Sequence, residues 1–292
     1  MDIKKYLKDR KTLIDEALDQ YLPKEDEYPP LIHQAMRYSL FAGGKRIRPI
    51  LALASTETVG GKIDDVLPAA CAIELIHTYS LIHDDLPSLD NDDLRRGKPT
   101  SHKKFSEAIA ILSGDALLTY AFWLIAAKTK EKSLIPHIVK EIAASSGTLG
   151  MIGGQTVDIL SSGKFVDSPT LEYIHTHKTG ALIRACLRTG CILGGGSREE
   201  LKKLSKFGKY IGLAFQIADD ILDITGDEEE MGKRSGADLA ANKITYPAIY
   251  GLSESREKAK NLIEKGISLL DEFGQRAAPL REIARFIGER SY

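Results

Sequence analysis

The sequence has few of the features that secreted or membrane proteins require. Its 292 residues contain three cysteines, Cys71, Cys186 and Cys191, without any CxxC pair, which predicts reduced, buried thiols rather than a disulfide framework. The longest apolar run, residues 116–127, is too short to span a bilayer, and the N-terminus lacks the apolar core of a secretion signal. These absences predict a cytoplasmic protein with no stable membrane association.

An excess of charge of either sign is also missing. Lys and Arg number 40 against 41 Asp and Glu, which leaves a formal net charge of −1. This balance gives no reason to expect nucleic acid or an acidic membrane as a partner. The electrostatics that matter for function must therefore be local. The length allows one or two domains with a sizeable core.

Signals for β-strands are equally scarce, whereas helical periodicity runs through nearly the whole chain. Residues 29–44, PPLIHQAMRYSLFAGG, begin with prolines and stop at a glycine pair, as a helix does. Further helices are predicted to open at Pro49, with Pro68 in a first turn, over 169–188, over 199–223, and twice in the last 40 residues. No linker divides the chain. We predict a single all-α domain over residues 1–292.

Negative charge is concentrated in two short segments. The stretch SLIHDDLPSLDNDDLRRG, residues 80–97, places five aspartates within ten positions behind an apolar run. The segment IADDILD, residues 217–223, repeats the arrangement: an aspartate pair after an apolar helical run, and a third aspartate shortly afterwards. We define the first aspartate motif as Asp84, Asp85 and Asp90, and the second aspartate motif as Asp219, Asp220 and Asp223.

Carboxylates at this density need cations. Two of them about 5 Å apart, at an effective dielectric constant of about 20, repel by roughly 3 kcal/mol. Beside apolar helices they would take up protons or unfold the site. Gln216, Asp219 and Asp223 share one helix face. Hard oxygen donors suit Mg²⁺ completed by water and phosphate. The alternative, a solvated acidic turn, fits one such motif equally well but is disfavoured for two motifs flanked by apolar helix.

Cationic side chains accompany the acidic motifs. Residues 41–49, FAGGKRIRP, carry Lys45, Arg46 and Arg48 between a helix stop and a helix start, where exposed N–H groups favour anions. His77 precedes Asp84 by two helical turns. The other candidates are Arg95, Arg96, Lys178 with Thr179, Lys233 and Lys243. Each alone is explained as well by a surface charge, and His77 by a hydrogen-bonded core histidine. Together with the aspartates they predict a site for two phosphorylated molecules with apolar tails.

These motifs, in their order, resemble those of trans-isoprenyl diphosphate synthases, and within that family the bacterial farnesyl diphosphate synthases. They are GGKRIRP, ELIHTYSLIHDDLPSLDNDDLRRGKPTSH, GDALL, GMIGGQTVD, HKTGALIRA, FQIADDILD and GKRSGADLAANKITYP. The resemblance runs from about residue 30 to the end of the sequence. It implies an isoprenoid synthase-type helical bundle around a deep central cavity, built as a homodimer.

The resemblance also implies a role for each matching residue. The two aspartate motifs hold three Mg²⁺ ions on an allylic diphosphate. Lys45, Arg48, His77 and Arg96 match residues that bind isopentenyl diphosphate. The residues that match those around the allylic substrate are Arg95, Lys178, Thr179, Gln216, Lys233 and Lys243. One departure is Asn242, which stands where a glycine often precedes the lysine and puts the placement of Lys243 in question.

The implied reaction is an ionisation followed by a 1′-4 alkylation. Dimethylallyl or geranyl diphosphate loses pyrophosphate, because Mg²⁺ and cationic side chains stabilise the departing charge. The Thr179 hydroxyl, the Lys178 carbonyl and the Gln216 amide oxygen are dipoles suited to the allylic cation. The double bond of isopentenyl diphosphate attacks, and a proton leaves from its C2. No side chain is an obvious base, so the released pyrophosphate is expected to take that proton.

The length of the product depends on how deep the cavity is. Tyr79 lies five residues before Asp84, about 7.5 Å deeper along the helix, and a ring there can form a floor. Spacing alone is equally compatible with an ordinary core aromatic. In the family, an aromatic residue here and the sequence LPSL between Asp85 and Asp90 mark bacterial C15 synthases. Ser80 is small and leaves room beyond C10. We predict (2E,6E)-farnesyl diphosphate.

Three rival functions remain open. A geranylgeranyl diphosphate synthase of the same family would differ in product length alone. A terpene cyclase or head-to-head synthase would share the fold, yet it needs no isopentenyl site, and here GGKRIRP and Arg96 are intact. A non-catalytic regulatory subunit of a synthase typically loses aspartates from one motif, whereas this sequence keeps both.

Overall fold

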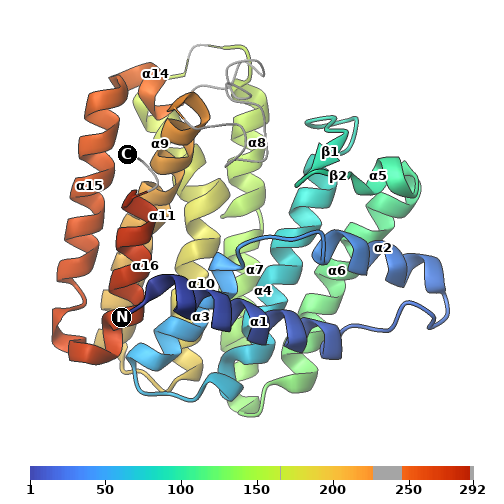
Figure 1. The fold of residues 1–292 in the computed structure, drawn as a ribbon, viewed down its shortest axis with the longest axis horizontal. Coiled ribbons are helices and arrows are strands. Elements are labelled where there is room, and N and C mark those ends of the chain that lie inside the picture. Colours follow the sequence, from blue (N-terminus) through green and yellow to red (C-terminus); the bar gives the residue numbers. More distant parts are fainter. Residues whose placement is uncertain (165, 226–244, 290–292) are drawn as a thin grey trace.

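A computed structural model describes residues 1–164, 166–225 and 245–289 of the chain. These residues form the predicted all-α bundle (Figure 1). Among the described residues, the β-structure consists of one short hairpin. Two predicted site residues, Lys233 and Lys243, and the neighbouring Asn242 lie outside the described residues. The remaining predicted site residues are all described.

The elements follow one another with short connections. The first half of the chain contains α1 (Ile3–Tyr21), α2 (Pro30–Leu40), α3 (Ile47–Thr58), α4 (Ile63–Asp84), the antiparallel strands β1 (Leu94–Arg95) and β2 (Lys98–Pro99), α5 (Ser101–Lys104), α6 (Glu107–Lys128), η1 (Lys132–Leu134) and α7 (Ile135–Ser146). The second half contains α8 (Met151–Ser161), α9 (Ser168–Ile174), η2 (His175–Gly180), α10 (Ala181–Leu193), α11 (Arg198–Thr225), α14 (Tyr246–Tyr250), α15 (Leu252–Ser268), η3 (Asp271–Ala277) and α16 (Ala278–Glu289).

Helix α4 is the centre of the bundle, packed against α3, α6 and α10. It is apolar on all sides, and a helix with this pattern must be covered all round. Residues 69–73 are completely inaccessible to solvent. The helix begins at Ile63, five positions before Pro68, so this proline lies inside the helix and not in its first turn as predicted. Asp84 is the last residue of α4, so the first aspartate motif starts at the end of this helix.

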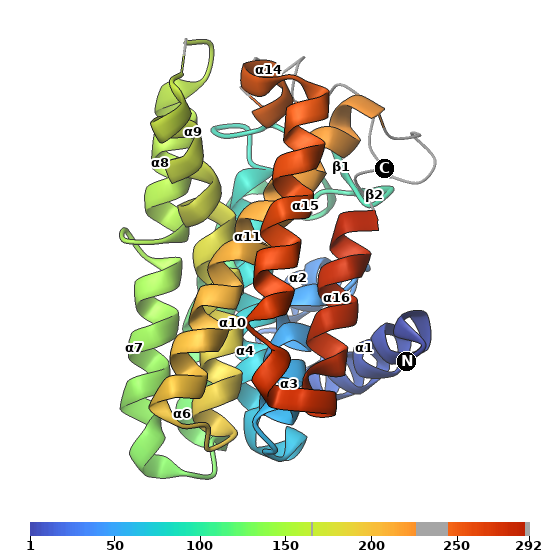
Figure 2. The same cartoon turned by 90° about the vertical axis from the view of Figure 1, so that its left-hand side faces the viewer.

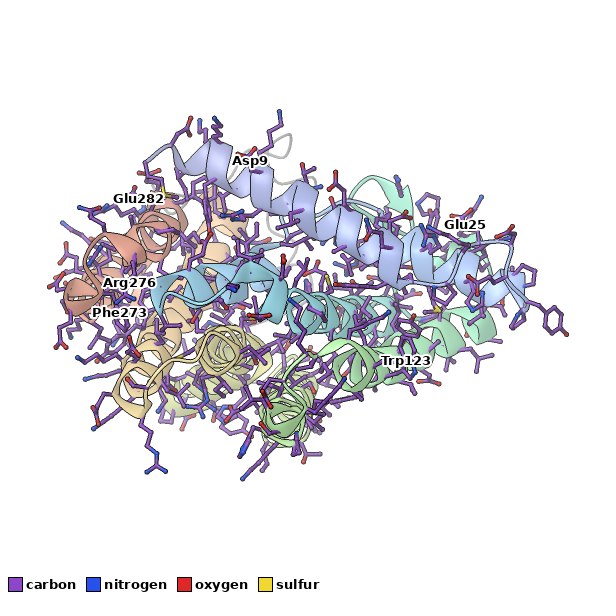
Figure 3. The ribbon with its side chains drawn as sticks, turned by 90° about the horizontal axis from the view of Figure 1, so that it is seen from below. Asp9, Glu25, Trp123, Phe273, Arg276 and Glu282 are labelled. Atoms are coloured by element: carbon purple, nitrogen blue, oxygen red, sulfur yellow. The ribbon has the colours of Figure 1, made fainter. Side chains whose placement is uncertain are left out.

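Two helices, α4 and α6, are long and apolar enough to cross a membrane by length and composition alone. The relevant window of α4 is 72% buried inside the protein, as in the core helix of a folded domain, whereas that of α6 is 39% buried. Helix α6 leaves Ile111, Leu112 and Trp123 exposed. Figure 3 shows Trp123 at the surface of the bundle. The apolar character of α4 is therefore explained by the core, and that of α6 by the core in part.

The helix predicted over 169–188 is divided in the structure. It starts as α9 at Ser168, passes through a π-helical segment, η2 (His175–Gly180), and continues as α10 to Leu193. A π-helical turn widens the backbone spiral by one residue and is frequent at functional sites. Sequence periodicity does not reveal such a turn. Lys178 and Thr179, two of the predicted site residues, lie on this segment.

The two aspartate motifs lie at the same end of the bundle. The hairpin β1–β2, which follows the end of α4, and the helices α9 and α14 gather at one end (Figures 1 and 2). Asp220, near the end of α11, accepts a hydrogen bond from the backbone N–H of Tyr246 at the start of α14. Both motifs therefore lie at the end of the bundle that also holds the hairpin and α14 (Figure 1).

Helix α1 lies crosswise to the long helices of the bundle (Figures 1 and 3). Its inner side is tied to α3 by Tyr6 and Arg10, which both donate to the carboxylate of Glu57. A second tie runs from Asp15 of α1 to Arg46, just before α3. The second of these ties fixes α1 to the segment that carries GGKRIRP.

Candidate active site

Asp84 of the first aspartate motif ends α4 in a half-buried position. Its Oδ1 accepts a hydrogen bond of 3.1 Å from Nε2 of Gln155 on α8. Burial raises the pKa of Asp84 to about 6; nearby Lys178 opposes this rise and Asp90 adds to it. A carboxylate with a raised pKa is short of compensating positive charge, and a bound cation would supply it.

Asp85, the next residue, is held differently. It is 3% exposed. Arg95 on β1 donates to both of its carboxylate oxygens, with Nε 2.7 Å from Oδ1 and 2.9 Å from Oδ2. Burial raises the pKa of Asp85 and the Arg95 guanidinium opposes that rise. Both carboxylate oxygens of Asp85 accept from Arg95, and this ion pair fixes the Arg95 guanidinium beside the first aspartate motif.

The loop after α4 folds back on the helix end. The backbone N–H of Asp90 donates to the carbonyl of Asp84 at 2.9 Å. Asn91 adopts a left-handed backbone conformation with φ of 53° and donates to the carbonyl of Leu86. This turn brings the exposed Asp90 side by side with Asp84.

In the second aspartate motif, Asp219 and Asp223 are half-buried and Asp220 is buried. Asp220 Oδ2 lies 2.9 Å from Nε2 of His175 on η2 and 2.8 Å from the backbone N of Tyr246. Its Oδ1 accepts from Gln216 Nε2 at 3.1 Å. Asp220 thus joins α11, η2 and α14, and both of its oxygens have protein partners.

A chain of polar contacts connects the two motifs across α8, η2 and α11. Lys178 pairs with Asp158 of α8, with Nζ 2.6 Å from Oδ2, and acts electrostatically on Asp84. The next residue, Thr179, donates through Oγ1 to Gln216 Oε1 at 2.8 Å. Gln216 in turn donates to Asp220. The predicted allylic-site residues on η2 and α11 therefore meet as one network.

The close approach of α8 to η2 requires a glycine. A Cβ atom at Gly154 would lie 2.2 Å from the backbone N of Lys178, which no side chain can tolerate. Gln155 and Asp158, on the same helix, reach Asp84 and Lys178. The sequence contained the signal for these contacts in GMIGGQTVD, yet neither residue was predicted to belong to the site.

Three of the residues predicted for isopentenyl diphosphate, Arg48, His77 and Arg96, lie near one another. Arg48 Nη1 lies 3.2 Å from His77 Nε2, and Arg96 donates to the carbonyl of Gly43. Desolvation and the surrounding guanidinium groups, Arg48 first, hold the pKa of His77 well below its usual value, so His77 is neutral and its Nε2 accepts. Lys45 is exposed beside them. Two adjacent guanidinium groups around a neutral imidazole form a site for an anion.

Arg95 and Arg96 also border a narrow opening. A cleft of about 30 Å³ is lined by residues of α2, α4 and the hairpin. Asp85 and both arginines contribute to it, together with Tyr38, Ser39, Ala42, Thr78, Leu81, Ile82, Pro99, Thr100 and Ser101. The charged groups of the two predicted substrate sites are therefore contiguous at this edge.

Tyr79 and Ser80 are deeper along α4. Tyr79 is 6% exposed and its ring centroid lies 5.8 Å from that of His83. Burial raises its pKa to about 12, and within the described part of the chain its hydroxyl has no hydrogen-bond partner. Ser80 Oγ donates to the His77 carbonyl at 2.9 Å. The Tyr79 ring thus occupies the interior one and a half turns below Asp84.

The donor set fits Mg²⁺ ions that are bound together with a diphosphate. Among the described residues, no three carboxylate, thiolate or imidazole groups converge into a ready-made metal cluster. Mg²⁺ characteristically takes one or two carboxylates and completes its octahedron with water and phosphate oxygens. The half-buried Asp84 and Asp219, both hard oxygen donors at the same end of the bundle, match that requirement.

An all-α bundle with two acidic motifs and two cationic groups at one end defines a class of protein: a helical synthase acting on diphosphate esters. A family model described as polyprenyl synthetase matches residues 29–277. The chain belongs to the polyprenyl synthetase family, the trans-isoprenyl diphosphate synthases, and is a prenyltransferase.

Relatives agree with this assignment over nearly the full chain. The sequence is 49% identical to heterodimeric geranylgeranyl pyrophosphate synthase large subunit 1, chloroplastic, of Arabidopsis thaliana, covering 99% of this chain and 80% of the relative. It is 47% identical to the geranylgeranyl diphosphate synthase of Cyanophora paradoxa, covering 98% and 96%. A crystal structure of an FPP/GFPP synthase from Zymomonas mobilis superposes with a TM-score of 0.87 at 37% identity, covering 98% and 99%.

Proposed function

We propose that this prenyltransferase extends an allylic diphosphate with isopentenyl diphosphate to give a short-chain product. The observation that carries the proposal is that α8 contacts both sides of the site: its Gln155 bonds Asp84 and its Asp158 pairs with Lys178, which is followed by the Thr179–Gln216 pair. The Arg48–His77 contact supplies the cationic side. An acidic, metal-binding half and a cationic half side by side suit two diphosphate esters that must react with each other.

We assign different roles within each aspartate motif. Asp84, Asp90, Asp219 and Asp223 would hold the metal, with three Mg²⁺ ions expected on the bound allylic diphosphate. Bound Mg²⁺ supplies charge neutralisation to the departing diphosphate. Asp85 and Asp220, both buried and engaged by protein donors, would keep their neighbours in place. This refines the sequence-based prediction, which gave all six aspartates the same role.

The allylic half of the site contains Arg95, Lys178, Thr179 and Gln216. Lys178 is half-buried and paired with Asp158, so it can exchange this carboxylate for a diphosphate oxygen without leaving η2. The Thr179 hydroxyl and the Gln216 amide oxygen form one hydrogen-bonded pair, and with the Lys178 carbonyl they would stabilise the allylic cation. We keep Lys233 and Lys243 as further ligands of this diphosphate.

The isopentenyl half contains Lys45, Arg48, His77 and Arg96. These groups would orient the diphosphate of isopentenyl diphosphate so that its double bond faces the allylic carbon. Neutral His77 would accept from Arg48 and thereby fix the guanidinium. The proton lost from C2 would go to the released pyrophosphate.

Two product lengths are supported by different observations. The names of the relatives favour geranylgeranyl diphosphate, C20, over the farnesyl diphosphate that we predicted from the sequence. Farnesyl diphosphate, C15, remains the second candidate because the buried Tyr79 ring fills the interior below Asp84. Chromatography of the product made from dimethylallyl diphosphate decides between them. If Tyr79 is a floor, the wild type gives C15 and Tyr79→Ala gives C20, whereas an unchanged C20 product assigns Tyr79 to the core alone.

The assembly we propose is a homodimer in the cytoplasm. The exposed apolar side chains Ile111, Leu112 and Trp123 of α6 supply a surface that a second copy would cover. One relative is named a large subunit of a heterodimer, and light scattering of the purified chain distinguishes a homodimer from a monomer that needs another subunit. Two of the plant relatives are named as chloroplastic proteins.

The rival functions are separated by one assay. Purified chain, Mg²⁺ and labelled isopentenyl diphosphate are incubated with an allylic primer, with and without a chelator. Chelator-sensitive incorporation of label into an apolar product supports the proposal. A regulatory subunit would incorporate none, and a cyclase would consume the allylic diphosphate without incorporating isopentenyl carbon.

A further inference from the structure

Arg46 differs from the two other cations of residues 41–49. Lys45 is exposed and Arg48 is half-buried, whereas Arg46 is 3% exposed. A side chain so enclosed does not face a substrate. Its position in GGKRIRP suggests an anion ligand, and its burial assigns it another task.

The Arg46 guanidinium is held by three different helices. Its Nε donates to Asp15 Oδ1 of α1 at 2.8 Å, and its Nη1 donates to Glu74 Oε1 of α4 at 2.8 Å. Its Nη2 donates to the carbonyl of Leu40, the last residue of α2, at 2.7 Å. Glu74 is also 3% exposed, so this pair is shielded from solvent and its geometry is tightly restricted.

The backbone around Arg46 needs such a fixed point. Gly43 and Gly44 have φ values of 116° and 119°, and Arg46 itself has φ of 53°, in the left-handed region. A segment of this kind has no regular helical hydrogen bonds to fix it before α3 begins at Ile47. The guanidinium contacts supply a restraint that the backbone lacks.

The restraint acts on the isopentenyl side of the site. Glu74 lies three residues before His77 on α4, and residues at this spacing share a helix face. Arg46 thereby fixes its loop to the same face that presents His77, and Arg48, two residues later, meets His77 at 3.2 Å. A loop that moved away from α4 would separate Lys45 and Arg48 from His77.

We propose that Arg46, with Asp15 and Glu74, is a positioning residue for the isopentenyl diphosphate site. The three side chains form a tether between α1, α4 and the GGKRIRP loop, in which Arg46 and Glu74 are buried and Asp15 is half-buried. They set the spacing between Arg48 and His77. The inference rests on the proposed function, because it needs an isopentenyl diphosphate site there. Asp15, Glu74 and the Leu40 carbonyl together engage all three guanidinium nitrogens, so Arg46 orients the diphosphate ligands and does not contact the diphosphate.

A matched control also involves α1. Glu57 of α3 accepts from Tyr6 and Arg10 of α1, and it too joins α1 to the start of the bundle. This tie lies away from residues 41–48. A purely structural tether and a positioning tether can therefore be compared within one chain.

The experiment measures isopentenyl diphosphate affinity in Asp15→Asn, Glu74→Gln and the control Glu57→Gln. Calorimetry with isopentenyl diphosphate alone, without metal or primer, gives Kd, and steady-state assays give KM for each substrate. We expect Kd and KM for isopentenyl diphosphate to rise about tenfold in the first two variants, the loss of roughly one charge-assisted hydrogen bond. The KM for the primer should stay within about twofold. The control should lose thermal stability with unchanged Kd.

Other outcomes overturn the proposal. Unchanged isopentenyl diphosphate affinity in Asp15→Asn refutes the tether even where Glu74→Gln fails to fold, because the Asp15 side chain is 26% exposed and tolerates substitution. An equal rise of both KM values, or an equal rise in Glu57→Gln, assigns the residues to stability alone. If the wild type binds no isopentenyl diphosphate, the proposed function itself fails, an outcome distinct from wild-type binding with unaffected variants.

Discussion

The two aspartate motifs share a pattern and differ in how the protein supports them. Each has a half-buried leading aspartate, Asp84 or Asp219, followed by a buried one, Asp85 or Asp220. The first motif lies at the end of a helix and is completed by a loop that folds back. The second lies entirely within α11. The same chemistry is thus built once from a loop and once from helical spacing.

The support of the buried aspartate differs in kind. Asp85 is engaged by the Arg95 guanidinium, a full positive charge. Asp220 is held by an imidazole, a side-chain amide and a backbone N–H. The first arrangement couples the motif to a predicted substrate ligand, and the second couples it to the packing of η2 and α14. The buried aspartate of the first motif is therefore held by an ion pair, and that of the second by hydrogen bonds from neighbouring helices.

The leading aspartates should be equivalent in catalysis despite these differences. Asp84→Ala and Asp219→Ala should each lower kcat by about a thousandfold, because each removes charge stabilisation of the leaving group. Steady-state rates at saturating Mg²⁺ test this, with helical circular dichroism as the control for folding. A variant that keeps near-normal turnover would show that its motif is not a metal site.

The buried aspartates should differ in stability. Asp85→Asn leaves Arg95 without its counter-charge and should lower the free energy of unfolding by about 3 kcal/mol. Asp220→Asn loses one of its two accepting oxygens but leaves no guanidinium unpaired, so about 1–2 kcal/mol is expected. Urea unfolding followed by circular dichroism measures both. Equal losses would mean that charge pairing gives the first motif no special stability.

Each motif also has a glutamine donor with a different task. Gln216 contacts both Thr179 and Asp220, so Gln216→Ala should lower kcat about a hundredfold by removing a dipole at the allylic carbon. Gln155 contacts Asp84, so Gln155→Ala should instead raise the Mg²⁺ concentration for half-maximal rate about tenfold. Magnesium titrations at saturating substrates separate these effects. A Gln155→Ala variant impaired only in kcat would contradict the assignment.

The smallest predicted effect concerns pH and the metal-free protein. The pKa of Asp84 is raised from 3.8 to about 6 on folding, so the folded state binds the proton more tightly than the unfolded state. Its contribution to stability is present below about pH 3.8 and is lost as the pH rises through about 6. At pH 7.5, Asp84→Asn should therefore be more stable than the wild type, by about 1 kcal/mol after solvent screening.

Thermal unfolding in the presence of a chelator tests that expectation. The advantage of Asp84→Asn should shrink as the pH is lowered from 7.5 to 5, because the wild-type carboxyl then becomes protonated. Asp223→Asn serves as the comparison within the second motif. A constant difference in stability across this pH range would mean that the gain in Asp84→Asn does not come from the titration of Asp84.

Much of the site could be predicted because it depends on local sequence. Apolar periodicity predicted the bundle, and proline and glycine marked the ends of α2. The aspartate pairs after apolar helix predicted an acidic site, and the order of the motifs was enough for the family. The position of Gln216 on the same helix as Asp219 and Asp223 followed from spacing alone. Such features involve residues within a few turns of one another, where geometry is set by the chain itself.

The tertiary structure decided which charged groups turn inward and which partners they find. Arg46 and Arg48 are two residues apart, yet Arg46 is buried because Asp15 and Glu74 arrive from other helices. Asp220 joins three helical segments because its partners His175 and Tyr246 come from η2 and α14. The energy of a buried charge depends on the oppositely charged or hydrogen-bonding group that is buried with it. Packing between distant segments decides which group that is.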